Sequence, residues 1–492
     1  MSIKLKSIKA VTWSFIQMIG TGGFKFLVGI YLARELNPSD FGLVGMILII
    51  LELGYSIVHG GLKASLIHTK DCQEEDYSTI FYFVLIESLI LYCLCWTISS
   101  YVAAFYQQAE LSNILKVYCL SFFFVGMSVV PKAIFEKELA FKILTKINLP
   151  GVVFGGLVGV VAASLGYGVW SLIYMELSMQ IVIALFFLIH NPWRPKLVFN
   201  LQRLQYHFSY GYKLLLAQII KSIGNNIYYI IIGKIFPASI LGYYSRADST
   251  KQFPINIFSN ALDSVTFPVF IKLKYQPKKL KAAYKKLLQQ IIFCLAPILG
   301  LFIILAVPLF EFLFTSKWLP AVPYFQLLCI IGLYTPLNYN NTHILKVFGR
   351  TDLVLNLELF KQILIIINIL LTAQYGILTL LIGQLFVVNI VFFLSTFFSV
   401  KYINYSSLEQ IRDLIPIIVI SIFTMFLIGC LDKYYLQTYT PIIRLIVGSL
   451  SGSSLYLVFA FAIKLQALEA FFDLIRQFIA SFRLPELITN RL

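Results

Sequence analysis

Apolar runs of about 20 residues alternate with short polar segments along most of the chain. A helix needs about 20 largely apolar residues to cross the hydrocarbon core of a bilayer. We therefore predict an all-α polytopic membrane protein with about fourteen transmembrane helices. The predicted spans are 11–32, 41–62, 78–105, 113–131, 147–166, 168–190, 209–236, 248–271, 288–314, 320–344, 352–373, 376–400, 413–430 and 441–463.

Four of these spans carry polar residues at helical spacing, so each presents one polar face. A charged residue at the bilayer centre costs about 2.5–3.5 kcal/mol on insertion scales, so these faces should meet protein or water. The stripes are Ser14, Gln17, Thr21 and Lys25 in 11–32; Glu52, Ser56, His59 and, at the end of the span, Lys63 in 41–62; Gln218, Lys221, Asn225 and Tyr228 in 209–236; and Gln252, Asn256, Ser259 and Asp263 in 248–271.

A short motif recurs after the first and the seventh predicted span. The segment 38–42 resembles 237–242, and Gly42 and Gly242 stand 200 residues apart. This offset covers six spans, so the two halves should be parallel repeats. We predict six-helix lobes at 1–200 and 201–405, two additional helices at 406–464 and an amphipathic cytoplasmic tail at 465–492.

The simplest use of four polar faces from two repeats is an aqueous cavity shared by the two bundles. The alternative is hydrogen bonding between helices of a closed bundle. The stripes are long and contain unbalanced cations, which favours the cavity. The uncharged residues expected to line it are Gln17, Thr21, Asn225, Ser56 and Asn256.

Two lysines, Lys25 and Lys221, lie near the middle of their spans, where a cation is most costly. Lysine binds phosphate as a compact point charge, so both could bind an anionic headgroup such as a pyrophosphate. The alternative is ion pairing with Glu52, Glu87 or Glu176. Both interpretations remain open for each lysine.

Three other ionisable residues are candidates for coupling transport to a proton or sodium gradient: Glu52, Asp263 and His59. For His59, near the end of its span, the alternative is an ordinary hydrogen-bonding role. No resident cofactor or metal is expected, because the seven cysteines form no metal-binding or disulfide pattern.

Composition and charge agree with a membrane protein. Hydrophobic residues make up 59% of the chain and charged residues 13%, against roughly 25% charged residues in soluble domains. The net charge of +16 could suggest nucleic acid, but 27 Lys and Arg residues fall in alternate loops and termini and only four in the others. This bias predicts cytoplasmic N- and C-termini and no nucleic-acid partner.

Sequence motifs of ATP hydrolysis, zinc proteolysis and serine hydrolysis are absent from the chain. No long hydrophilic stretch could form a soluble catalytic domain. These observations argue against an enzyme and favour a transporter driven by an ion gradient or by its substrate's own gradient.

Several segments resemble one family of transporters: 32–42, Gly60-Gly61-Leu62 with 66–76, 166–172 and 241–247. They look like the lipopolysaccharide-biosynthesis flippases of the multidrug, oligosaccharidyl-lipid and polysaccharide exporter superfamily, over roughly residues 5–460. The resemblance implies two lobes in a V and a central cavity lined by spans 1, 2, 7 and 8. It also implies cationic cavity residues. Lys25 and Lys221 fit that expectation by position, while Arg34 and Arg246 lie in the resembling segments at the outer rim.

The resemblance implies a flippase that moves an undecaprenyl-pyrophosphate-linked oligosaccharide to the outer leaflet by alternating access, for O-antigen, capsule or exopolysaccharide synthesis. Its partners would be this lipid-linked substrate, membrane lipids, and the polymerase and glycosyltransferases of the pathway. The location would be the bacterial cytoplasmic membrane. The alternatives are a cation-coupled multidrug exporter of the same superfamily and a membrane-bound saccharide polymerase or ligase.

Overall fold

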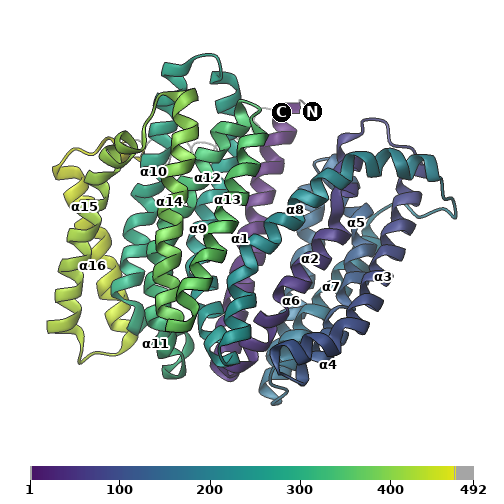
Figure 1. The fold of residues 1–492 in the computed structure, drawn as a ribbon, viewed down its shortest axis with the longest axis horizontal. Helices are drawn as coiled ribbons and strands as arrows, with labels where there is room; N and C mark the ends of the chain where they lie inside the picture. The colour runs from purple at the N-terminus through teal and green to yellow at the C-terminus, as the bar shows by residue number, and fades with distance from the viewer. Residues whose placement is uncertain (1–2, 470, 473–492) are drawn as a thin grey trace, which may run out of the picture. The chain divides into compact units, whose positions relative to one another are not determined.

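The computed structural model describes residues 3–469, 471 and 472; the side chains at 3–12, 14–15 and 258–268 are outside this description. In the described residues every regular element is a helix, which confirms the predicted all-α class (Figure 1). The chain divides into two compact units, Met1–Ser245 and Arg246–Leu492. The predicted lobe boundaries at 200 and 405 stay predictions.

The first unit contains eight helices and the beginning of a ninth (Figure 1). They are α1 (Ile3–Glu35), α2 (Pro38–His68), α3 (Glu74–Tyr106), α4 (Glu110–Tyr118), α5 (Ser121–Lys137), α6 (Phe141–Ser164), α7 (Trp170–His190), α8 (Leu201–Ile235) and α9 (Ala238–Leu273).

The second unit contains the rest of α9 and the helices that follow it. They are α10 (Pro277–Ile304), α11 (Ala306–Phe314), η1 (Ser316–Ala321), α12 (Val322–Val347), α13 (Thr351–Thr372), η2 (Ala373–Tyr375), α14 (Ile377–Ile403), α15 (Ser407–Leu431), η3 (Asp432–Leu436) and α16 (Pro441–Ala462).

Thirteen of the described helical stretches are long and apolar enough to cross a membrane, so the protein is a multi-pass membrane protein. The fourteen predicted spans fall mainly on helix, although 113–131 is divided between α4 and α5 by a turn at residues 119 and 120. The one without such an apolar window, 248–271, belongs to α9. The total of fourteen therefore stays a prediction. The tail predicted at 465–492 is described only at its start, because 470 and 473–492 lie outside the described residues.

The predicted span 288–314 is two helices rather than one, with a break at Leu305 between α10 and α11. Pro308 explains the break. Its nitrogen cannot donate a hydrogen bond to the carbonyl of Ile304, and its ring crowds that carbonyl. The chain therefore leaves helical geometry at Leu305 and begins a new helix at Ala306.

The repeat predicted from the sequence recurs in the helix boundaries. α1 ends at Glu35 and α8 ends at Ile235; α2 begins at Pro38 and α9 begins at Ala238. Both pairs of boundaries are 200 residues apart. At the first junction the backbone N–H of Asn37 donates a 2.8 Å hydrogen bond to the carboxylate of Asp40, and Pro38 takes the first helical position. Both features favour the start of a helix there.

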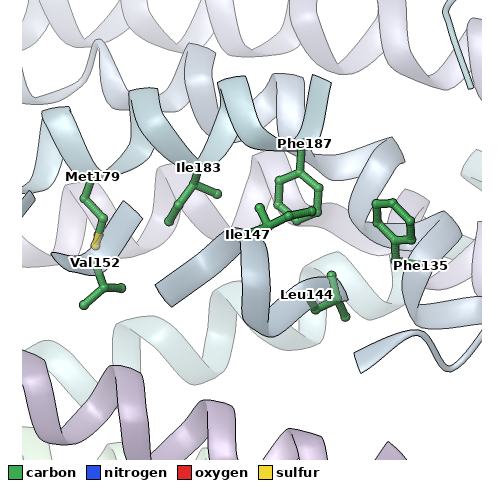
Figure 2. Close-up of a cluster of buried hydrophobic side chains, with 7 residues drawn as sticks. All are labelled: Phe135, Leu144, Ile147, Val152, Met179, Ile183 and Phe187. Carbon is green, nitrogen blue, oxygen red and sulfur yellow. The ribbon is translucent and has the colours of Figure 1, made fainter. Parts of the chain in front are cut away.

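Apolar packing holds α5, α6 and α7 together in the first unit. Figure 2 shows side chains of α6 facing those of α7, with Phe135 of α5 at one end of the cluster. Its members are all at least nine-tenths buried: Phe135, Leu144, Ile147, Val152, Met179, Ile183 and Phe187. α6 also packs against α1, so this cluster supports the helix that carries Gln17, Thr21 and Lys25.

A buried polar network joins four helices of the second unit. The Oδ1 atom of Asn341 in α12 accepts hydrogen bonds from Tyr284 of α10 at 2.7 Å, Ser399 of α14 at 3.2 Å and Gln410 of α15 at 3.3 Å. The Asn341 amide donates to Thr396 at 3.2 Å. These five residues are almost inaccessible, so the network fixes how the helices pack.

Candidate functional site

α2 and α8 lie side by side in opposite directions through the first unit. Close backbone approaches occur along the pair. A Cβ at Gly61 would lie 1.8 Å from the carbonyl oxygen of Gly211, so neither position has room for a side chain. Small residues allow such close packing between membrane helices. The polar stripes of the predicted second and seventh spans thereby face each other.

A cavity of about 450 Å³ opens between these two helices. Its polar lining comes from Glu52, Tyr55, Ser56 and His59 of α2 and from Gln218 and Ser222 of α8. The other lining residues are Gly60, Gly61, Leu214 and Leu215.

Hydrogen bonds between the helices close one end of the cavity. The amide of Asn226 in α8 donates a 2.6 Å hydrogen bond to Oε2 of Glu52 and a second, at 2.9 Å, to the carbonyl of Ser222. The hydroxyls of Ser56 and Ser222 lie 3.2 Å apart. The Glu52 carboxylate is half-buried and thus held toward α8. The polar stripes of α2 and α8 are joined in part by direct hydrogen bonds, as expected for a closed bundle. Elsewhere they line the cavity, as expected for a transport pathway.

A kink in α2 shapes the other end of the cavity. Gly60 has φ 33° and ψ 174°, a conformation outside the helical region that side-chain-bearing residues rarely adopt. Beside it, Nδ1 of His59 is buried without a hydrogen-bond partner in the described part of the chain. A buried polar atom in that state costs free energy, so His59 offers an unused donor or acceptor next to the kink.

An ion pair lies one turn beyond His59. The ammonium of Lys63 is 2.9 Å from Oε1 of Glu136 in α5, and both side chains are about one-fifth exposed. Lys63 ends the polar stripe that the sequence predicts for the second span. In the structure its charge is compensated by α5.

The lining contains one carboxylate, one imidazole and several hydroxyl and amide groups, and no lysine or arginine among its described residues. Such a surface can hydrogen-bond a polyhydroxylated molecule, and Glu52 can bind a cation or a proton. Three predicted residues, Glu52, Ser56 and His59, come together here. Their roles in transport stay predictions.

The predicted cationic residues of the first unit lie away from this lining. Lys25 in α1, Lys221 in α8 and Arg34 at the end of α1 are all exposed. Asn225, next to the buried Asn226, is exposed as well. A common role of Lys25 and Lys221 in anion binding therefore stays a prediction.

The uncharged residues predicted in α1 are half-buried, and the hydroxyl of Thr21 donates a 2.7 Å hydrogen bond to the carbonyl of Gln17. This bond is local to the helix. It leaves the amide of Gln17 for other contacts.

Three predicted residues lie in α9. The guanidinium of Arg246 is 5.3 Å from the ring centroid of Phe314 and 5.7 Å from that of Trp318, a cation–π arrangement that favours a structural role. Asn256 accepts a 2.9 Å hydrogen bond from Gln252. The side chain of Asp263 lies outside the described residues, so its proposed role stays a prediction.

Two features of the cavity were not predicted. Tyr55 lines it and shares a 2.8 Å hydrogen bond with Ser121 of α5, but the polar stripe assigned from spacing skipped this position. The kink was also missed, although a Gly-Gly pair inside an apolar span indicates one.

Comparison with known proteins places the chain among polysaccharide-synthesis proteins. A family described as "Polysaccharide biosynthesis protein" matches residues 31–323. The chain is 26% identical to the lipopolysaccharide biosynthesis protein WzxC of Escherichia coli (strain K12), over 83% of this chain and 84% of that protein. It is 26% identical to the teichuronic acid biosynthesis protein TuaB of Bacillus subtilis (strain 168), over 62% of each. The match to TuaB thus spans less than two thirds of that protein.

Solved structures show the same fold. The lipid II flippase MurJ in an inward closed conformation matches with a TM-score of 0.72 at 15% identity, over 93% of this chain and 98% of that one. An inward-facing multidrug resistance transporter of the MATE family matches with a TM-score of 0.62 at 18% identity, over 81% of this chain and 100% of that one. These matches confirm the fold expected from the resemblance. Because the family match covers more than half of its length, the chain belongs to this polysaccharide biosynthesis protein family.

Proposed function

We propose that the protein is a flippase that moves an undecaprenyl-pyrophosphate-linked oligosaccharide from the cytoplasmic to the outer leaflet of a bacterial cytoplasmic membrane. It would work by alternating access and serve synthesis of a surface polysaccharide. We propose transport rather than catalysis as its activity. The observation that carries the proposal is the family membership together with the names of the relatives.

Those names cover polysaccharides of different chemistry. WzxC is named for lipopolysaccharide biosynthesis, TuaB for teichuronic acid biosynthesis, and ExoT of Rhizobium meliloti (strain 1021), 24% identical over 66% of each chain, as a succinoglycan biosynthesis transport protein. Transport of a lipid-linked saccharide is a step that such pathways can share while their sugars differ. This supports a common substrate class for the family without fixing the sugar.

The geometry between α2 and α8 supports movement of a polar substrate. Hydroxyl, amide and carboxylate groups gather around a cavity inside a membrane protein, where unpaired polar groups are costly. The kink at Gly60 gives α2 a point where its two segments can change their relative direction. Lys25 and Lys221 remain the proposed contacts for the pyrophosphate, since their exposed ammonium groups suit a phosphate.

The proposal extends to coupling, partners and placement. Protons or sodium ions would drive transport through Glu52, Asp263 or His59, with no resident cofactor. Both termini would be cytoplasmic. A polymerase and glycosyltransferases of the same pathway would supply and consume the lipid-linked substrate.

A deletion strain tests the function in cells. Loss of the protein should stop surface polysaccharide and accumulate its lipid-linked precursor, and the wild-type gene should restore export. Lys25→Ala and Lys221→Ala should fail to restore it at normal membrane abundance, whereas Lys213→Ala, also in α8, should succeed. Normal export by both the Lys25→Ala and the Lys221→Ala variant would refute the cationic contact, and normal polysaccharide in the deletion strain would refute the proposed function.

One observation favours a second candidate, a cation-coupled multidrug exporter. The described cavity lining has a carboxylate and no basic residue, a pattern suited to cationic drugs, and the fold matches a MATE transporter. A drug-susceptibility screen of the deletion strain separates the two functions. Hypersensitivity to cationic drugs with intact surface polysaccharide would favour the exporter.

A further inference from the structure

The second unit contains a separate cavity of about 820 Å³ formed by α13, α14 and the start of α15. Its lining divides into a charged end and an apolar wall. Arg350, Lys401, Tyr402, Ser406 and Ser407 form the charged and polar end, and Leu353, Phe393, Phe397, Phe398 and Val400 form the wall. Two of the wall residues are strongly exposed, Phe397 at 72% and Phe393 at 46%.

The charged end has an oriented guanidinium. Arg350 donates from Nε and Nη2 to the carboxylate of Asp352, at 2.9 Å and 2.6 Å, and from Nη1 to the hydroxyl of Tyr402 at 3.0 Å. A guanidinium has five N–H groups, so two remain after these bonds. Asp352 and Tyr402 thus fix the plane of the group and leave donors for a further acceptor.

Lys401 supplies the uncompensated charge. Its ammonium has no ion-pair or hydrogen-bond partner within the described part of the chain, and the residue is exposed. The nearby acidic groups are already paired: Asp352 with Arg350, and Glu409 with Lys281 at 2.9 Å. The charged end therefore presents a net positive surface to whatever occupies the cavity.

The position of this cavity fits a membrane lipid. Arg350 and Ser406 lie in loops next to helix ends, and Lys401 lies in the last turn of α14, all at the ends that the charge distribution assigns to the cytoplasmic side. The phenylalanine wall lies on the membrane-spanning α14. Anionic headgroups are attracted to basic clusters at that surface. A lipid seated here would place its phosphate at the charged end and an acyl chain along Phe393 and Phe397.

We propose that this cavity, formed by α13, α14 and the start of α15, is a binding site for an anionic phospholipid. The site is separate from the α2–α8 cavity, and the inference does not rest on the proposed transport function. The ring of Tyr402 lies tilted against that of Phe348, with 4.7 Å between the ring centroids, and its hydroxyl accepts the hydrogen bond that orients Arg350.

The test counts lipids bound to the full-length protein in detergent by native mass spectrometry. Phosphatidylglycerol should bind more tightly than phosphatidylethanolamine. Lys401→Gln should weaken phosphatidylglycerol binding about tenfold, the size expected for one charge-assisted contact. Phe397→Ala should weaken it as well. Lys279→Gln removes the same charge from an exposed position in the first turn of α10 and serves as the matched control, with binding unchanged.

Three outcomes would overturn the proposal. The first is equal binding of the two lipids by the wild type. The second is unchanged binding in both Lys401→Gln and Phe397→Ala. The third is competition by glycerol 3-phosphate at the concentration at which phosphatidylglycerol binds, which would indicate a site for a free phosphate anion. Both test variants replace exposed side chains, so loss of folding is not expected to obscure the result.

Discussion

Gly42 at the start of α2 lies against Ala238 at the start of α9, so close that a Cβ on Gly42 would come 1.8 Å from the Ala238 carbonyl oxygen. The relationship is reciprocal, since a Cβ on Gly242 would come 1.8 Å from the carbonyl oxygen of Pro38. Gly42 and Gly242 are the repeated positions 200 residues apart. The repeat seen in the sequence therefore forms a two-fold-like contact between the ends of its own helices.

This contact predicts that alanine is not tolerated at either glycine. Gly42→Ala and Gly242→Ala should each destabilise the protein by about 1–3 kcal/mol, because backbone must move to admit the methyl group. Gly23→Ala in α1 is the control, since a Cβ there meets nothing within 4 Å. Thermal unfolding in detergent measures the difference. Melting midpoints for Gly42→Ala and Gly23→Ala that agree would contradict the close contact.

The kink at Gly60 predicts that alanine at this position acts through backbone strain and not through a steric clash. A Cβ at Gly60 would meet no atom within 4 Å, but its φ of 33° strains any side-chain-bearing residue by roughly 1–2 kcal/mol. Gly60→Ala should straighten α2 or destabilise it, and transport should fall. Gly23→Ala should be neutral or slightly stabilising, because alanine favours helix. Wild-type transport and stability in Gly60→Ala would show that the kink is dispensable.

The Asn341 network predicts graded losses in the second unit. Tyr284→Phe removes one of its hydrogen bonds and should cost about 1 kcal/mol. Asn341→Ala removes all four and leaves buried partners unsatisfied, so it should cost about 3 kcal/mol. Chemical denaturation in detergent can rank the two. An equal effect of both variants would contradict the graded loss, because the single hydrogen bond of Tyr284 would then matter as much as all four.

A nearly buried ion pair at the end of α15 predicts a larger effect than an exposed one. Arg444 donates to both carboxylate oxygens of Asp432, at 2.8 Å and 2.6 Å, and the two side chains are 14% and 11% exposed. Asp432→Asn should destabilise by about 3 kcal/mol, since it leaves a charge unpaired. Glu74→Gln breaks an exposed pair with Lys196 outside the predicted spans and should cost less than about 1 kcal/mol. The reverse order of melting points would contradict this ranking.

The sequence predicted the membrane spans well, because a bilayer imposes one length and one polarity on each helix. It also predicted the repeat, because the two similar segments, 38–42 and 237–242, lie at helix junctions, where capping residues leave a local signal in the sequence. It missed the break at Leu305, which depends on how Pro308 acts on the preceding turn. A hydropathy average over about 20 residues does not detect the loss of one backbone N–H donor, as at Pro308.

The site was predictable only in part, for a physical reason. Helical spacing places Glu52, Ser56 and His59 on one face of α2, and the structure has all three around one cavity. The spacing of polar residues along a helix does not show which other helix its polar face contacts. The pairing of Glu52 with Asn226 depends on the close approach of α2 and α8, and the Asn341 network joins helices that are far apart in sequence.

Reconstitution tests the proposed flippase activity most directly. The purified protein would be placed in liposomes containing a fluorescent undecaprenyl-pyrophosphate oligosaccharide, and a reagent that cannot cross the membrane would report which leaflet holds the fluorophore. We predict that the wild type moves the lipid between leaflets, and that the Lys25→Ala, Lys221→Ala double variant is at least about tenfold slower, as expected for lost phosphate contacts. A wild-type rate equal to that of protein-free liposomes would contradict the account.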